Sequence, residues 1–465
     1  MQTSEPKLTM MHQKGLAILG LDKADARVLV VGLGVTGLSV IRFLQQNHIK
    51  TAVVDSREKP PGLNELEESC EGIAVYTGGF NEDVFAVATH LIMSPGVSLQ
   101  EKEIQRAIDR GVSVLGDIDI FSVCAKAPIV GITGSNGKST VTTLLGDMAL
   151  QAQWDVRLGG NLGTPALDLL STVEPDLYIL ELSSFQLETT TFLKTKAAAV
   201  LNISPDHMDR YADVQAYSVA KARVLKAAEG AVLNRADQRV MAMKKDCTGI
   251  AVTFALDVPE EGQYGVIKTP QGCFLAKGKE RLVSTDELKI KGSHNIENAL
   301  AAMALADALS IPNVAQKNAL NVFAGLPHRT QWVAEINHVS WVNDSKATNP
   351  GACLAAIEGL QGPLVLLVGG DGKGADFGVL KEAVKKHVSW VVLMGQDAKR
   401  FKREVIVDTP FVFVENMEEA VAVAARAAQP GDTVLLSPAC ASLDQYKSYQ
   451  QRGDRYIEAV RMLKS

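Results

Sequence analysis

Short apolar runs alternate with amphipathic segments along most of the chain, and this alternation predicts strands separated by helices. The predicted strands are 27–31, 51–54, 91–94, 112–115, 129–132, 177–182, 197–202, 231–233, 339–342, 363–368, 390–394 and 433–436. Helices are predicted at 139–151, 214–228 and 444–464, with others beginning near 37, 294, 350, 377 and 415, and 157–161 is predicted as a glycine-rich loop. Such alternation is typical of α/β folds with mostly parallel sheets.

Composition and charge narrow the functional classes. The chain has 47 Lys and Arg residues against 53 Asp and Glu, and its net charge of -6 argues against nucleic acid as the main partner. Its 6 cysteines are scattered without metal-ligand spacing, which is typical of reduced thiols. The N-terminus lacks signal-peptide features, and no apolar run is long enough for a membrane span. We therefore expect a cytoplasmic protein that acts on small molecules.

The stretch GITGSNGKST at 131–140 has the parts of a phosphate-binding loop. It follows an apolar strand, its glycines permit a tight turn, and Lys138 and Ser139 stand at the start of a predicted helix. Backbone N–H groups and the helix N-terminus favour an anion there, and the Ser139 hydroxyl can bind magnesium. Ile132 stands where the usual pattern has its first glycine, so the spacing is a variant. The alternative is a Gly/Ser-rich turn without a ligand.

A second glycine motif, GLGVTG at 32–37, lies between a predicted strand and a predicted helix, and Asp55 follows the next strand. This arrangement is the fingerprint of dinucleotide binding. It first suggests a nicotinamide-dependent dehydrogenase, although the same geometry suits any ribose diphosphate. The glycines could also serve only close packing of the helix against the strand.

The length of the chain and the order of its motifs predict three domains. A chain of 465 residues is too long for one hydrophobic core. We expect a Rossmann-like N-terminal domain over residues 1–116 and a central P-loop ATPase-type domain with a mostly parallel sheet over 117–325. A second Rossmann-like domain is expected over 326–465.

Four side chains in the central segment are candidates for chemistry, and each has a structural alternative. Glu181 ends an apolar strand, which favours a magnesium ligand over a solvated carboxylate. His207 follows a strand, where α/β proteins bind ligands, but an isolated histidine is more often a surface residue. Lys221 lies in a predicted helix, where solvent exposure is the default. Asn298 either caps a helix or offers its amide to a nucleotide.

Polar clusters follow three of the predicted C-terminal strands: NDSKATN at 343–349, GGDGK at 369–373 and SPACASLDQ at 437–445. Because strand ends of a parallel sheet share one edge, we expect residues from these clusters to meet in one cleft. GGDGK is too short for a second phosphate loop and indicates a turn that presents Lys373. The segment 444–464 is predicted as an amphipathic helix on the sheet with its charges in solvent.

Taken in order, these motifs resemble the Mur ligases from about residue 27 to the end of the chain. The resemblance is carried by GLGVTG, GITGSNGKST, LELSSFQLE (180–188), DHMDRY (206–211), HNIENALAA (294–302), LPHR (326–329), NDSKATN, GGDGK and LSPACASLDQY (436–446). The phosphate loop also resembles that of folylpolyglutamate synthases, which lack the GxGxxG domain. Thr330-Gln331 departs from the family pattern, which commonly has an acid beside an apolar residue there.

The resemblance implies an ATP-dependent ligase that adds D-glutamate to UDP-N-acetylmuramoyl-L-alanine, a step of peptidoglycan precursor synthesis. ATP would phosphorylate the substrate carboxylate, and the glutamate amine would attack the resulting acyl phosphate. The first domain would then hold a UDP-sugar and not a nicotinamide. Magnesium is implied at two sites, one of which would use a carbamate formed on Lys221.

The resemblance also implies the residues of each site. Lys138, Glu181, His207 and Lys221 would be catalytic, with Ser139 and Glu181 on one magnesium and His207 and the Lys221 carbamate on the other. ATP would contact Gly134, Ser135, Asn136, Gly137, Lys138, Ser139, Thr140, Asn298, Arg329 and Asp344. The UDP-sugar would contact Val35, Thr36, Asp55, Ser56, Arg57, Gly96 and Asn161, and D-glutamate would contact Lys346, Thr348, Lys373, Ser442, Leu443 and Tyr449.

Two other functional classes stay open on the sequence. One is a regulatory ATPase, for which phosphate release without added amino acid and sugar nucleotide would be evidence. The other is an oxidoreductase that uses the first domain, for which an absorbance change with NAD(P)H would be evidence.

Overall fold

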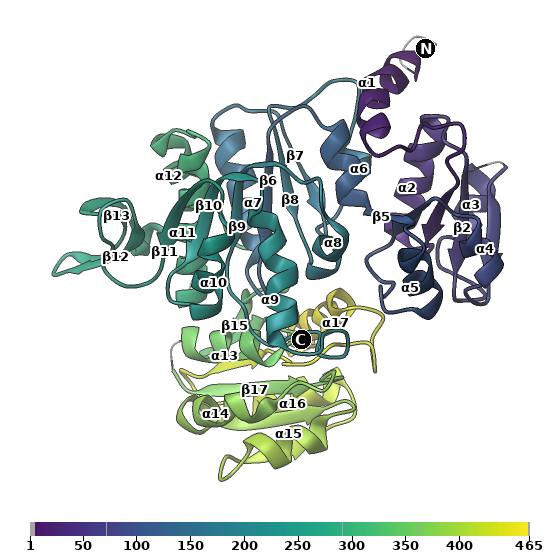
Figure 1. The fold of residues 1–465 in the computed structure, drawn as a ribbon. Helices are drawn as coiled ribbons and strands as arrows, with labels where there is room; N and C mark the ends of the chain where they lie inside the picture. The colour runs from purple at the N-terminus through teal and green to yellow at the C-terminus, as the bar shows by residue number, and fades with distance from the viewer. Residues whose placement is uncertain (1–4, 71, 291, 361, 464–465) are drawn as a thin grey trace.

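The computed structural model describes residues 5–70, 72–290, 292–360 and 362–463, which form three lobes, each around its own sheet (Figure 1). The N-terminal lobe is purple in Figure 1, the central lobe runs from blue to green, and the C-terminal lobe is green to yellow. The predicted α/β class with three lobes and mostly parallel sheets is confirmed. Over the described part of the chain, no helix is long and apolar enough to cross a membrane.

The N-terminal sheet has the strand order β3-β2-β1-β4-β5, and its neighbours pair in parallel. Its elements are β1 (Val28–Val31), α2 (Val35–Gln46), β2 (Thr51–Asp55), α3 (Leu63–Ser69), β3 (Ala74–Thr77), α4 (Glu82–Ala86), β4 (His90–Met93), α5 (Lys102–Asp109) and β5 (Ser113–Gly116). The strand order reverses at β1, and the carboxyl ends of β1 and its neighbours therefore form the crevice where such sheets bind ligands. The helices α1 (Glu5–Ile18) and α6 (Asp117–Cys124) pack together between this lobe and the central one (Figure 1).

The central sheet has the strand order β14-β13-β12-β11-β10-β9-β6-β8-β7. Its strands are β6 (Ile129–Thr133), β7 (Val156–Gly160), β8 (Leu177–Glu181), β9 (Thr195–Val200), β10 (Ala228–Asn234), β11 (Ile250–Phe254), β12 (Tyr264–Thr269), β13 (Gly272–Lys277) and β14 (Glu280–Ser284). The helices are α7 (Lys138–Gln151), α8 (Ser184–Thr189), α9 (Val214–Ala222), α10 (Gln238–Ala242), α11 (Ser293–Ala308) and α12 (Asn313–Val322). The strands β6 and β8 are buried along their whole length, as expected for unbroken apolar runs.

The C-terminal sheet has the strand order β15-β16-β20-β17-β18-β19, with β15 antiparallel to β16. Its strands are β15 (Gln331–Ile336), β16 (Val339–Asn343), β17 (Leu364–Gly369), β18 (Val388–Met394), β19 (Phe411–Phe413) and β20 (Thr433–Leu436). The helices are α13 (Pro350–Gly359), α14 (Lys381–His387), α15 (Ala398–Val405), α16 (Met417–Ala427) and α17 (Tyr449–Met462). The polar clusters after β16, β17 and β20 share the sheet edge that faces the central lobe, where α13 packs against α11.

Some predicted elements differ from the observed ones. The segment predicted as a glycine-rich loop at 157–161 is mostly the strand β7, because it pairs in parallel with β8. The two strands lie so close at Gly160 that a Cβ atom there would come 2.5 Å from the Glu181 carbonyl oxygen. The helix predicted to reach residue 228 is wrong at its end, since α9 ends at Ala222 and Ala228 opens β10. The short edge strands β3, β15 and β19 are absent from the prediction, and most of their residues are exposed or only partly buried.

The predicted domain boundaries near 116 and 326 fall between the sheets and stay predictions. The first and last predicted domains also include residues 1–4 and 464–465, which lie outside the described residues, as does the predicted end of the last helix at 464.

The C-terminal helix begins at Tyr449, later than predicted, and the expectation that its charges lie in solvent is wrong for Arg452. The Arg452 side chain is 2% exposed and donates hydrogen bonds to the carbonyl oxygens of Ser345, Cys440 and Ala441 at 2.8–3.2 Å. Burial lowers the pKa of Arg452 to about 10, and the guanidinium stays charged at neutral pH. Arg452 therefore joins the polar cluster after β16 to the one after β20.

We predict that Arg452→Met lowers the free energy of unfolding by about 2–4 kcal/mol, because the buried carbonyl groups of Ser345 and Cys440 lose their Arg452 donors. The matched control is Arg455→Met on the same helix, whose exposed pairs with Glu418 and Glu458 should contribute less than about 1 kcal/mol. Urea unfolding followed by circular dichroism measures both variants. Equal stability of the two variants would contradict the structural role of Arg452.

Candidate active site

The phosphate loop connects β6 to α7 through glycines in conformations that other residues rarely adopt. Gly134 has a φ of 151° and Gly137 a φ of 85°. A Cβ atom on Gly137 would come 2.3 Å from Oδ1 of Asn298, so the turn can pack against α11 only with glycine there. The helix α7 then begins at Lys138, and the N–H groups of its first turn have no carbonyl partners within the helix. These free donors and the helix dipole suit a phosphate.

Lys138 folds back over this loop. Its Nζ atom donates to the carbonyl oxygens of Gly134 and Ser135, both at 2.9 Å. Desolvation lowers the pKa of Lys138, while the nearby carboxylates of Glu181 and Asp206 oppose this shift. The ammonium group is thus held beside the helix start, within reach of an anion bound there.

Glu181, at the end of β8, meets the first turn of α7. Its Oε2 atom accepts from the Ser139 hydroxyl at 2.5 Å, and its Oε1 atom accepts from the Asn161 amide at 2.7 Å. Burial alone would raise the pKa of Glu181, but the Lys138 charge and these hydrogen bonds lower it overall. An ionised carboxylate beside a serine hydroxyl at a phosphate loop is an oxygen donor set that fits magnesium.

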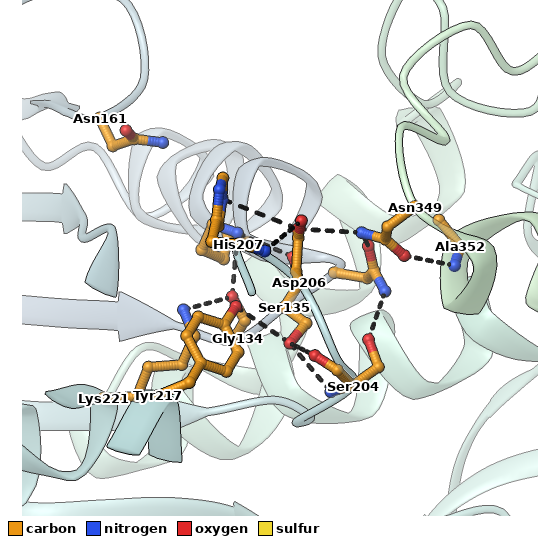
Figure 2. A network of polar contacts seen from close by, with 12 residues as sticks. Gly134, Ser135, Asn161, Ser204, Asp206, His207, Tyr217, Lys221, Asn349 and Ala352 are labelled. Atoms are coloured by element: carbon orange, nitrogen blue, oxygen red, sulfur yellow. Dashed lines mark hydrogen bonds and ion pairs between the residues drawn. The ribbon is translucent and has the colours of Figure 1, made fainter. Parts of the chain in front are cut away.

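Lys221 is buried beneath the same loop, so the solvent-exposed alternative is wrong for this residue. Its side chain is 1% exposed, and Nζ donates to the Gly134 carbonyl oxygen at 2.9 Å (Figure 2). Nζ also donates to the Thr133 hydroxyl at 3.3 Å. The Tyr217 ring lies 4.7 Å from Nζ. Burial and the Lys138 charge lower the pKa of Lys221 well below its usual value. A neutral amine is the form that reacts with carbon dioxide.

His207 lies beside Asp206 in the loop after β9. Its backbone has a φ of 58°, its ring centroid is 4.7 Å from that of Phe185, and its Nε2 atom is 3.8 Å from Oδ2 of Asp206 (Figure 2). Burial lowers the pKa of His207 although Asp206 opposes the shift, which favours the neutral imidazole that binds metals. Within the residues that the structure describes, no three His, Cys, Asp or Glu side chains cluster as a metal site.

A cavity of about 410 Å³ between the central and C-terminal lobes, here called the junction cavity, brings most of these residues together. From the central lobe it is lined by Lys138, Ser139, Asn161, Glu181, His207 and Lys221, among others. From the C-terminal lobe it is lined by all six residues predicted for D-glutamate: Lys346, Thr348, Lys373, Ser442, Leu443 and Tyr449. Side chains from three separate strand ends therefore share one cleft with the phosphate loop.

Desolvation lowers the pKa of Lys346 to about 8, and its Nζ atom lies 4.1 Å from the centre of the Tyr449 ring. Lys346 therefore still carries a charge for most of the time at neutral pH. The side chain suits an anionic group in the junction cavity.

A second cavity of about 380 Å³ lies on the other side of the loop and is lined by Thr140, Asn298, Arg329 and Asp344 together with His294 and Asn295. Arg329 reaches back from it to donate to the Ser139 hydroxyl at 2.6 Å. Burial raises the pKa of Asp344 to about 7, against hydrogen bonds from the Thr330 N–H and the Ser437 hydroxyl.

Both residues of the Thr330-Gln331 pair make polar contacts, and Thr330 lines this cavity. The Thr330 hydroxyl lies 3.2 Å from Nε2 of His294 on the central lobe. The Gln331 side-chain oxygen accepts from the His328 N–H at 2.9 Å. Thr330 therefore contacts the central lobe, whereas the Gln331 contact lies within the C-terminal lobe.

A third cavity, of about 610 Å³, lies at the crevice of the N-terminal sheet. It is lined by all seven residues predicted for the UDP-sugar: Val35, Thr36, Asp55, Ser56, Arg57, Gly96 and Asn161. The Asp55 carboxylate already accepts from the Leu33 N–H at 2.7 Å and from the Arg57 guanidinium at 2.6 Å. Burial alone would raise the pKa of Asp55, but the hydrogen bonds from Arg57 and Leu33 lower it. Asp55 thus fixes the glycine loop and Arg57.

Sequence reasoning missed two residues at the centre of the site. Asp206 precedes His207, and Asn349 caps α13 and reaches the phosphate loop (Figure 2). Both stand inside motifs that the sequence singled out, DHMDRY and NDSKATN. The available signal was that each residue stands beside a predicted site residue. Their contact could not be predicted, because Asp206 and Asn349 are 143 residues apart in sequence.

Comparisons with known proteins agree over most of the chain. The Mur ligase MurD-like N-terminal domain matches residues 26–116, the Mur ligase middle domain matches 132–306, and the Mur ligase glutamate ligase domain matches 328–440. The chain is 50% identical over 445 residues to the UDP-N-acetylmuramoylalanine–D-glutamate ligase of Nitrosococcus oceani, covering 95% of this chain and 97% of that protein. It is 49% identical over 450 residues to the protein of that name from Methylococcus capsulatus, covering 97% of each. A pseudomurein peptide ligase type C from Methanothermus fervidus shares the fold, with a TM-score of 0.60 at 18% identity over 94% of this chain and 100% of that one.

We predict that Lys138→Ala reduces the turnover of ATP by about a thousandfold. The reason is that the variant loses a positive charge beside the phosphate loop, and water stabilises a phosphate there less well than a fixed cation does. The protein should stay folded, since the partners of Lys138 are loop carbonyls at the edge of a cavity. Initial rates and thermal unfolding measure the two effects. A folded variant with near-normal turnover would rule out a role in phosphate binding.

Proposed function

Because the chain belongs to the Mur ligase family, we propose that it is an ATP-dependent ligase that joins D-glutamate to UDP-N-acetylmuramoyl-L-alanine, with release of ADP and phosphate. This reaction is a cytoplasmic step in the synthesis of peptidoglycan precursors. The observation that carries the proposal is the junction cavity, in which a phosphate loop faces lysines from a second lobe. Family membership also favours a ligase over the two alternatives, a dehydrogenase and a regulatory ATPase.

In this proposal, the central lobe holds and polarises ATP. Lys138 and the first-turn N–H groups of α7 fix the β- and γ-phosphates, and Arg329, which already reaches Ser139, adds a further cation. Asn298 and Asp344 line the neighbouring cavity, which suits the nucleoside. The substrate carboxylate attacks the γ-phosphorus, and the acyl phosphate that forms is then attacked by the amine of D-glutamate.

Magnesium, when bound, neutralises charge on the phosphoryl group and holds it in line for transfer. Ser139 and Glu181 would hold one ion, since a hydroxyl and an ionised carboxylate already converge there. His207 and a carbamate on Lys221 would hold another. The neutral Lys221 amine adds to carbon dioxide and loses a proton, which turns a buried base into an oxygen ligand of opposite charge.

The two outer lobes bind the UDP-sugar and D-glutamate. The crevice of the N-terminal sheet suits the UDP-sugar, and Asn161 lines both this crevice and the junction cavity. In the C-terminal lobe, Lys346 and Lys373 would meet the two carboxylates of D-glutamate, with Thr348 and Ser442 as donors. The amine is then left free to attack.

Phosphate release is the test of the proposed function. The purified protein is assayed with ATP, magnesium and UDP-N-acetylmuramoyl-L-alanine against amino acids of both hands. Release that requires both the sugar nucleotide and D-glutamate is expected. Release with another amino acid, or release without any amino acid, would overturn the proposal.

We predict that Lys221→Ala reduces kcat by about a hundredfold or more, because a charged group beside the reacting phosphate is lost. A short carboxylate such as acetate should restore part of the activity, since it can supply the missing oxygen ligands. The matched control is Lys226→Ala, which removes an exposed lysine nearby and should leave kcat unchanged. NMR with isotopically labelled bicarbonate should detect a carbamate in the wild type and not in Lys221→Ala. Full activity of Lys221→Ala would contradict the carbamate.

A further inference from the structure

We propose that Asn349 is a positioning residue. It holds the D-glutamate side of the junction cavity at a fixed position relative to the phosphate loop and His207. The proposal rests on the proposed function and adds a residue to it. Asn349 belongs to the C-terminal lobe, at the start of α13, and follows Thr348 directly. Figure 2 shows its side chain between this lobe and the central one.

The Asn349 amide makes three contacts at once. Its Nδ2 group donates to Oδ2 of Asp206 and to Oδ1 of Asn136, both at 3.2 Å. Its Oδ1 atom accepts from the Ala352 N–H at 2.9 Å and so caps α13. The side chain is 5% exposed, so water competes little for these contacts. One residue thus ties the start of a C-terminal helix to two separate loops of the central lobe.

The two partners in the central lobe belong to different parts of the chemistry. Asn136 lies in the phosphate loop, and its own N–H donates to Oδ1 of Asn202 at 2.8 Å. Asp206 accepts from the His207 N–H at 3.0 Å and approaches the His207 ring. A shift of Asn349 would therefore move both the loop that faces phosphate and the backbone that orients His207.

Close packing next to Asn349 supports this reading. A Cβ atom on Gly351 would come 2.9 Å from the Ser204 hydroxyl, so the first turn of α13 lies directly against the loop that carries Asp206. The phosphate loop reaches the same place, because the Ser135 hydroxyl donates to the Ser204 carbonyl oxygen at 3.0 Å. The Asn349 contacts therefore fix a tight joint, and a small displacement there changes the width of the junction cavity.

The cap and the contacts between lobes can be separated by substitution. Serine caps helices about as well as asparagine, but it cannot supply an amide N–H group. Asn349→Ser therefore keeps the cap of α13 and removes both donors toward the central lobe. The matched control is Asn416→Ser at the cap of α16 in the same lobe, where the side chain accepts from the Glu419 N–H at 2.9 Å.

We expect Asn349→Ser to lower kcat/KM for D-glutamate by about tenfold to a hundredfold, because one of the lost contacts is to a carboxylate. Asn349→Ser should stay folded at the assay temperature by circular dichroism, and Asn416→Ser should keep wild-type kinetics. Wild-type kinetics for Asn349→Ser would overturn the proposal. An inactive wild type with D-glutamate would instead overturn the proposed function, so the two failures are distinguishable.

A charge swap tests the direction of the contact. Asn349→Asp places a second carboxylate against Asp206 and should be less active than Asn349→Ser, although aspartate still caps the helix. Adding Asp206→Asn restores a donor and an acceptor with their roles exchanged, and the double variant should be at least about tenfold more active than Asn349→Asp. Failure of this rescue, with both variants folded, would overturn the proposal.

Discussion

Mutual compensation of buried charges at the end of the central sheet is the interaction on which the site depends. Lys138, Lys221 and Arg329 lie around the junction cavity near the carboxylates of Glu181 and Asp206. Each of these charges would be costly alone, since desolvation of an unpaired ion outweighs most single contacts. The cations outnumber the carboxylates, and the cost falls on Lys221, whose pKa is lowered well below its usual value. An anionic ligand at the loop would complete the balance.

The same constraint explains why the predicted site residues lie on three lobes. A single sheet edge offers few strand ends, and a ligand with several charged groups needs cations, amides and carboxylates from different directions. The junction cavity joins strand ends of the central sheet to those of the C-terminal sheet, while Asn161 links it to the N-terminal crevice. Arg452 keeps the C-terminal strand ends at a fixed spacing by bonding to the clusters on both sides. The site is therefore a property of the packed lobes and not of one domain.

Local sequence signals were sufficient where the residues of one element determine its own structure. The apolar runs of β6 and β8 predicted buried strands, and the glycines with Lys138 predicted the turn into α7. Local signals failed where an element takes its structure from a neighbour. The strand β7 contains Gly159 and Gly160 and is a strand only because β8 lies alongside it. The burial of Arg452 depends on carbonyl groups that precede it by 11 to 107 residues in sequence.

The sequence by itself determined the α/β class, the order of the three lobes and the chemistry available at each strand end, because these follow from periodicity and from glycine and lysine placed at turns. Only the tertiary structure decided that Lys221 is buried beneath Gly134 and that Asn349 reaches Asp206 and Asn136. A helix pattern cannot say which face will lie under a loop, and a cap residue gives no sign of a second partner. The burial of Lys221 follows from packing within the central lobe, and the partners of Asn349 follow from packing between two lobes. Both kinds of packing join residues that are far apart along the chain.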